Sequence, residues 1–316
     1  MARLRQQGRA VPWSWTVPGG RKAGTREALV LCVRWIALAT VGLACRSAAL
    51  QPPSPARPEL VEPAELLEAL RATLERDHIV LDAGPVVSAC ARGYGVDEWC
   101  VRCEIATRRD PAGLDPDMID AVAIAFARYP MDVLAAVHLE HVSLCRTIRY
   151  DHEHGASPAG LAIAEDRRLM LSLETYRGDF TLEQIVHHEL FHLFDHAMLG
   201  AQAYDDHEWH ALNPPAFAYA DPATETAARP AGFVNRYATT NEREDRASVF
   251  EYVMGQPEAL CEIMAIDPIV RAKVTTIRAR VGRIMGAARL PPDRCALSLP
   301  RPRMKSPIPL NVPRIR

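Results

Sequence analysis

The sequence predicts an α+β fold with a small mixed sheet and several helices, one of which carries a cluster of histidines. Three observations support this. Strand-like alternation is confined to residues 141–173, helical spacing of apolar residues recurs before and after that stretch, and 48% of the residues are hydrophobic. Helices and strands that occur in separate runs are typical of α+β folds. We expect a histidine-bearing helix to follow the strands directly.

The predicted elements follow from local patterns along the chain. Pro63 stands at the start of the first helix, and Pro130 closes the second. Two strands joined by a turn lie within 161–173, the second at Leu169–Leu173. Residues 205–237 are rich in Pro and Ala, which predicts a long loop. In order, the helices are 63–77, 115–130, 181–199, 241–255 and 270–285, and a further strand is 141–150.

Composition limits the classes of partner. The chain has 316 residues, 24% of them charged, and a formal net charge of -2. Near-neutral charge gives no general reason to bind acidic polymers. Aromatic residues make up 6% of the chain and offer few stacking platforms, so nucleic acid is not expected as a partner.

The N-terminus, residues 1–49, has the layout of an export signal. Basic residues within 21–26 precede an apolar run, Trp35–Ala44, that is too short to span a bilayer comfortably. Three interpretations stay open: ordinary cleavage after Ser47–Ala49, lipidation at Cys45, or an uncleaved membrane anchor. Each predicts export to the bacterial periplasm, cell envelope or exterior. The last two attach the chain to the membrane through its N-terminus or a lipidated Cys45.

The rest of the chain divides by composition. Residues 50–63 form a proline-rich linker, and 64–298 form a globular domain with an N-terminal helical portion. Residues 299–316 are basic and proline-rich, which predicts a disordered tail.

Six cysteines follow the signal region, an even number that favours disulfides in an exported protein while leaving the pairing open. They are Cys90, Cys100, Cys103, Cys145, Cys261 and Cys295. The close spacing of Cys100 and Cys103 is also compatible with a redox pair or half of a zinc knuckle. A knuckle requires a second close pair, which the sequence lacks.

The helix at 181–199 carries the pattern HExxH. Thr181 and Gln184 form a capping box that marks its start. His188 and His192 are four residues apart, so both imidazoles lie on one face and can reach one zinc ion. Glu189 between them is placed to take a proton from zinc-bound water. The alternative is a buried helix with incidental histidines, and His187 is interpreted as structural.

A catalytic zinc needs a third protein ligand. Asn241 can cap a helix whose first turn carries Glu242, Glu244 and Asp245. Acidic residues in a first turn are also favoured by the helix dipole, so spacing alone does not choose among them.

Two segments resemble a known family: "HELFHLFD" from His188 and "YATTNEREDRASVF" from Tyr237. They resemble the gluzincin metallopeptidases, in particular the family that includes the catalytic domain of anthrax lethal factor and many bacterial zinc peptidases. The resemblance implies a zincin-like domain that holds one catalytic Zn2+ and cleaves a peptide or protein substrate. The implied zinc ligands are His188, His192 and Glu244. Glu189 is the implied general base, and Tyr237 the implied oxyanion donor.

The resemblance carries further expectations. The strand at 168–173 matches the edge strand on which such enzymes lay an extended substrate. Ser248 stands where other gluzincins often have an aspartate that orients a ligand histidine. Asp195 is expected to orient a ligand or the helix, and Glu242 stays a competing ligand. Residues 208–220 also resemble the family, with no role that the sequence explains.

We therefore expect an exported zinc metalloendopeptidase. One alternative is a catalytically silent zinc-binding envelope protein on the same scaffold. Another is a disulfide-stabilised interaction module with a structural zinc, which would require a fourth ligand from His187 or His196.

Overall fold

The computed structural model describes residues 63–82, 85–92, 98–105, 116–151, 157–173, 181–219, 229–293 and 295. The predictions for the export signal, for Cys45, for nearly all of the linker and for the tail lie outside these residues. Among the described residues, no helix is both long and apolar enough to cross a membrane.

In the described part of the chain, the strands form two groups in sequence that are separated by two helices, and further helices precede and follow them. The helices are α1 (Pro63–Arg76), α2 (Pro116–Phe126), α3 (Met131–Ala136), α4 (Leu182–Leu199), α5 (His207–His210), α6 (Glu242–Gly255), α7 (Pro257–Ile266) and α8 (Pro268–Met285). The strands are β1 (Val80–Leu81), β2 (Val86–Arg92), β3 (Glu98–Ile105), β4 (His141–Tyr150), β5 (Gly160–Ile163) and β6 (Arg168–Ser172). The α+β class and the small mixed sheet are confirmed.

The sheet has the order β2-β3-β4-β6-β5, and β1 pairs with β4 beside that path. Strands β4 and β6 are parallel, whereas β5 and β6 form an antiparallel hairpin. The expectation that the strand at 168–173 is the edge strand is wrong. β6 is enclosed between β4 and β5, and all five of its residues are buried. Because the hairpin folds back on the outer side of β6, β5 is the edge strand.

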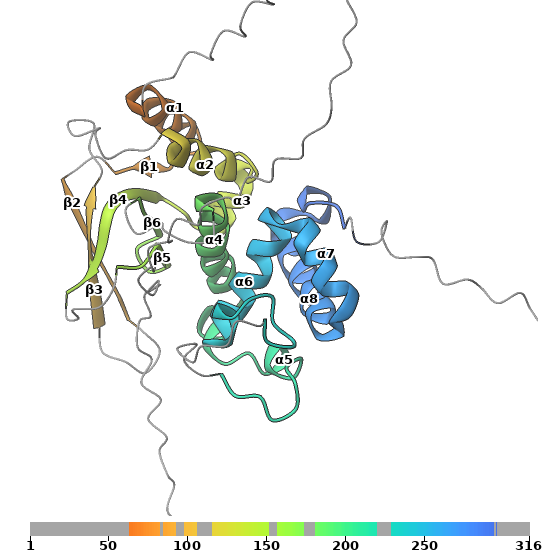
Figure 1. Ribbon diagram of the computed structural model, residues 1–316. Coiled ribbons are helices and arrows are strands. Elements are labelled where there is room, and N and C mark those ends of the chain that lie inside the picture. Colours follow the sequence, from red (N-terminus) through yellow and green to blue (C-terminus); the bar gives the residue numbers. More distant parts are fainter. Residues whose placement is uncertain are drawn as a thin grey trace, which may run out of the picture.

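Helices α4, α6 and α8 follow one another in layers on one side of this sheet (Figure 1). Helix α4 packs against β5 and β6, α6 packs against α4, and α8 packs against α6. Aromatic rings fill the α4–α6 contact: the Phe250 ring centroid lies 5.2 Å from that of Phe191 and 5.6 Å from that of Phe194. Burial of large aromatic side chains dominates the energetics of such contacts. The packing therefore fixes α4 against α6, the two helices that carry the predicted metal ligands.

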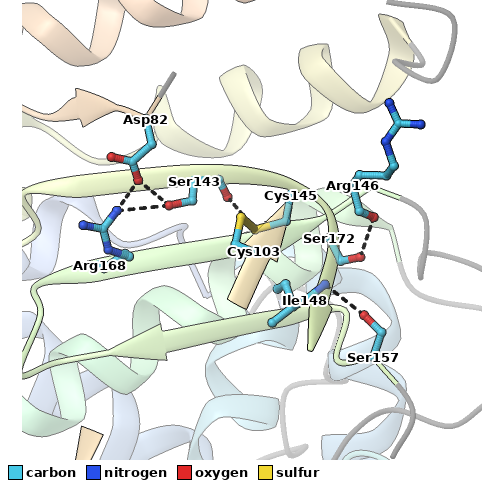
Figure 2. The surroundings of a disulfide bond; sticks show 9 residues. All are labelled: Asp82, Cys103, Ser143, Cys145, Arg146, Ile148, Ser157, Arg168 and Ser172. Atoms are coloured by element: carbon cyan, nitrogen blue, oxygen red, sulfur yellow. Dashed lines mark hydrogen bonds and ion pairs between the residues drawn. A yellow bond between two sulfur atoms is a disulfide. The ribbon is translucent and has the colours of Figure 1, made fainter. Parts of the chain in front are cut away.

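The hairpin of β2 and β3 encloses a second, smaller core. Its buried residues are Ala89, Val101, Cys103, Ile105, Cys145, Ile148, Ile163 and Met170. A disulfide between Cys103 and Cys145 ties β3 to β4 inside this core, as Figure 2 shows. Beside it, the Asp82 carboxylate accepts hydrogen bonds from Ser143 and Arg168, which joins the end of β1 to β4 and β6 (Figure 2).

All six cysteines that follow residue 49 are paired, so the predicted disulfides are confirmed. The pairs are Cys90–Cys100, Cys103–Cys145 and Cys261–Cys295. Since Cys100 and Cys103 bond to different partners, they form neither a redox pair with each other nor half of a zinc knuckle.

Candidate metal centre

The start of α4 is fixed by the predicted capping box. The Thr181 side chain accepts a hydrogen bond from the Gln184 backbone at 3.3 Å, and Gln184 Oε1 accepts from the Thr181 backbone at 2.7 Å. Reciprocal bonds of this kind satisfy two of the free donors at a helix N-terminus. The helix therefore begins at a defined residue, Leu182, nearly two turns before His188, the first histidine of HExxH.

His188, His192 and Glu244 meet between α4 and α6. Asn241 caps α6 by accepting a hydrogen bond from the Glu244 backbone at 3.0 Å. Glu244 Oε2 lies 2.9 Å from His188 Nε2 and 3.5 Å from His192 Nε2. The three ligand atoms all lie within 4.8 Å of one another, so this group could hold a metal ion. Two imidazole nitrogens and one carboxylate oxygen form a donor set that suits zinc.

The protonation of the histidines also fits a cation site. Burial lowers the pKa of His188, but hydrogen bonds with Glu244 and Glu251 outweigh burial and raise it to about 10. Without a metal, a protonated ring thus supplies the positive charge that these carboxylates require. Burial lowers the pKa of His192, which keeps that ring neutral, as a metal ligand must be.

Glu189 lies beside the ligands and against the edge strand. Its side chain is buried, and it accepts a hydrogen bond from the Ala162 backbone on β5. Burial, its largest influence, raises the pKa of Glu189 to about 7. Gly160 on β5 gives it room, since a Cβ there would lie 2.6 Å from Glu189 Cγ. The structure thus places a carboxyl group that titrates near neutral pH between the metal ligands and β5.

Tyr237 lies beside His188. It begins the short 3-10 helix Tyr237–Thr239, and its ring centroid is 5.8 Å from that of His188. Burial, together with the negative charges of Glu244 and Glu189, raises the pKa of Tyr237 well above its ordinary value. The phenol therefore stays protonated and can donate a hydrogen bond.

The other candidate ligands are engaged elsewhere. Glu242 accepts hydrogen bonds from the Asp206 backbone at 2.8 Å and contacts His210 Nδ1 at 3.1 Å. His187 faces away from the site, with its Nδ1 2.7 Å from the hydroxyl of Tyr129. Neither His187 nor His196 belongs to the group of described residues that could hold a metal. Among the described residues, the structure thus supports neither Glu242 as the third ligand nor a fourth protein ligand of a structural zinc site.

Asp195 does not touch the ligands. Its carboxylate instead accepts two hydrogen bonds from Arg246 on α6, at 2.9 and 2.7 Å. Both side chains are fully buried. Asp195 therefore ties the histidine-bearing helix to the helix that carries Glu244.

The segment 208–220 has a structural role that the sequence did not explain. Trp209 and Tyr219 donate hydrogen bonds to Asp245 Oδ2 at 2.9 and 2.8 Å. Lys273 on α8 donates to the same oxygen at 2.7 Å. Since Asp245 directly follows Glu244, this network anchors the start of α6 to the segment and to α8.

Sequence reasoning missed one buried carboxylate next to the ligands. Glu251 Oε2 lies 2.9 Å from His188 Nδ1, and Glu251 Oε1 accepts from Gln184 at 3.4 Å. Ser248, where an orienting aspartate was considered, is buried, and its hydroxyl has no hydrogen-bond partner among the described residues. A signal was present: Glu251 follows Glu244 by seven residues, two helical turns, and so shares its face.

Comparison of the chain with protein-family models, curated proteins and solved structures gives no match. The chemistry of the site therefore has to be inferred from its geometry. Three potential metal ligands, a buried carboxyl group and a protonated phenol converge on one place. Such a set can hold a metal ion, accept a proton from water and donate a hydrogen bond to a developing anion.

Proposed function

We propose that this chain is a zinc metalloendopeptidase of gluzincin type on a zincin-like fold. The observation that carries the proposal is the meeting of His188, His192 and Glu244 within 4.8 Å, with Glu189 beside them. When bound, zinc supplies a Lewis acid that polarises a water molecule and the carbonyl of the scissile peptide bond.

Glu189 acts as the general base and acid. Its carboxylate receives a proton from the attacking water and delivers it to the nitrogen of the leaving amine. A pKa of about 7, set mainly by burial, suits both transfers near neutral pH. The hydrogen bond from the Ala162 backbone holds the carboxyl group toward β5.

Tyr237 donates a hydrogen bond to the oxyanion that forms as water adds to the carbonyl. Its raised pKa keeps the proton on the phenol. A fixed donor of this kind stabilises charge that appears only in the transition state.

The substrate is an extended peptide that pairs with β5. Within the described residues, β5 pairs with no strand other than β6, and its Ala162 backbone lies beside Glu189. Addition of a strand to such an edge binds a peptide backbone in many complexes. The three disulfides support an oxidising location, in agreement with an exported enzyme.

The proposal is tested by digesting a peptide library with the purified chain and with its Glu189→Gln variant. Zinc content is measured in both. We expect the wild type to cleave and the variant to lose activity by about 10²–10⁴-fold with zinc still bound. Equal cleavage by both proteins would contradict the mechanism. A zinc-loaded wild type that cleaves nothing would favour the catalytically silent zinc-binding protein.

A further inference from the structure

A chain of hydrogen bonds leads from the start of α4 to the first metal ligand, and its direction can be determined. The backbone N–H of Thr181 can only donate, so the Gln184 atom 2.7 Å away is the amide oxygen. The amide nitrogen of Gln184 therefore occupies the other position and donates to Glu251 Oε1 at 3.4 Å. The backbone donor at Thr181 thus determines which atom of the Gln184 amide is the oxygen and which is the nitrogen.

The direction continues through Glu251 to the ligand. An ionised carboxylate only accepts hydrogen bonds, and Glu251 Oε2 lies 2.9 Å from His188 Nδ1. His188 Nδ1 must therefore carry a proton. Without a metal, Nε2 carries a proton as well, because it lies 2.9 Å from the Glu244 carboxylate. When a metal ion replaces that proton, Nδ1 keeps its own, and the lone pair of Nε2 binds the ion.

The two ligand histidines differ in this respect. His192 Nδ1 is buried and has no hydrogen-bond partner among the described residues. His188, Glu251 and Gln184 are each only 2% exposed, so water does not compete for their contacts. Gln184 is also closely packed, because a Cβ added at Gly255 would lie 3.1 Å from its Cγ. Of the two ligand histidines, His188 is therefore the one whose ring is oriented by a hydrogen bond at Nδ1.

We propose that Glu251 and Gln184 are positioning residues of the metal centre: together they keep a proton on His188 Nδ1, so that Nε2 is the nitrogen that binds the ion. The inference rests on the proposed function for the identity of the metal. It gives Gln184 two tasks, because the residue that completes the capping box also orients Glu251. Partners of this kind typically change metal affinity by about 10–100-fold when they are altered.

The test exchanges the amide and the carboxylate. In Glu251→Gln, the new side chain has an NH2 group that must point at either the Nδ1–H of His188 or the NH2 of Gln184, so two donors face each other. In Gln184→Glu, two carboxylates face each other. The double variant Gln184→Glu/Glu251→Gln restores every direction: residue 184 accepts from the Thr181 backbone and from residue 251, and residue 251 accepts from His188.

The readouts are the zinc dissociation constant, from competition with a chromogenic chelator, and the visible spectrum of the cobalt-substituted protein. We expect each single variant to bind zinc about 10–100-fold more weakly than the wild type. The double variant should bind zinc at least about tenfold more tightly than Glu251→Gln. Independent packing effects of the two substitutions would not produce this coupling. Ser248→Ala, on the same face of α6, is the matched control and should leave affinity and spectrum unchanged.

Each outcome decides between the proposals. If Glu251→Gln binds zinc as tightly as the wild type, or the double variant binds no better than the weaker single variant, the positioning role is overturned. If the cycle behaves as expected while the wild type cleaves no peptide, the positioning role stands and the peptidase proposal fails. A wild-type chain that binds no zinc would overturn both.

Discussion

Adding one methyl group at Gly160 should disable the site while leaving the metal bound. Gly160 lies on the edge strand β5, and a Cβ there would be 2.6 Å from Glu189 Cγ and 2.9 Å from Ile185 Cγ2. Its backbone is not in the left-handed region, so the effect of Gly160→Ala is steric alone. The three atoms nearest to the new methyl group belong to Glu189 and Ile185, and none belongs to a metal ligand.

The size of the effect follows from these distances. Carbon atoms in contact are about 3.5–4.0 Å apart, so the Glu189 side chain must withdraw by roughly 1 Å. A misplacement of about 1 Å at a reacting group can reduce the rate by about 10²-fold. The new contact should also reduce the free energy of unfolding by about 1–3 kcal/mol, as overpacking does.

The assay compares kcat/KM for a cleaved peptide with zinc affinity and the urea midpoint. Gly160→Ala should lose about 10²-fold in kcat/KM and keep the zinc affinity of the wild type. Gly282→Ala on α8 is the control, because its new Cβ would approach nothing closer than 3.7 Å. If Gly160→Ala retains full kcat/KM, Glu189 is not the base or β5 does not hold it in place.

Four further predictions concern the supporting structure and the chemistry. Asp195→Leu should lower the free energy of unfolding by about 3–5 kcal/mol in urea titrations, because it removes the carboxylate closest to the buried Arg246 and leaves Asp206, at 3.3 Å, as the nearest one; adding Arg246→Met should recover part of the loss, and additive losses would contradict this. Tyr237→Phe should reduce kcat by about 10²-fold with unchanged zinc affinity, and an equal fall in affinity would indicate a structural role instead. Burial lowers the pKa of His187 below 6.5, so the folded protein binds a proton there less readily than the unfolded chain does. As pH falls below about 6.5, the metal-free wild type should therefore lose unfolding free energy relative to His187→Gln. If the free energies of the two proteins change in parallel with pH, this explanation is refuted. Mass spectrometry under non-reducing conditions should find no free thiol among the six cysteines of the three disulfides, and labelled thiols there would refute the pairing.

Local signals in the sequence predicted the elements that depend on neighbouring residues. The capping box and the four-residue spacing of the histidines lie within α4 itself, so its start and its polar face could both be predicted. The β5–β6 hairpin is also local, and its two strands were expected. Which of them is the edge strand depends on the pairing of β6 with β4, in which Arg168 lies opposite His141. No local pattern in residues 160–173 indicates that pairing, so the wrong strand was predicted to be the edge strand.

The contacts around the ligands were not predictable for the same reason. Glu251 reaches His188 across 63 positions in sequence, and Lys273 reaches Asp245 across 28. These partners are brought together by the packing of α4, α6 and α8, which periodicity alone does not specify. Helices α3 and α7 and the β2–β3 hairpin were missed as well, since short or cysteine-bearing segments give weak periodic signals.

The most direct test of the account is zinc K-edge X-ray absorption on the zinc-loaded chain. We expect one zinc ion bound by two imidazoles and one carboxylate, those of His188, His192 and Glu244, with a water oxygen completing the coordination. Glu244→Gln should weaken zinc binding, whereas Glu242→Gln should not. A third imidazole or any sulfur ligand in the spectrum would contradict the ligand set proposed for this chain, and four protein ligands without water would indicate a structural zinc.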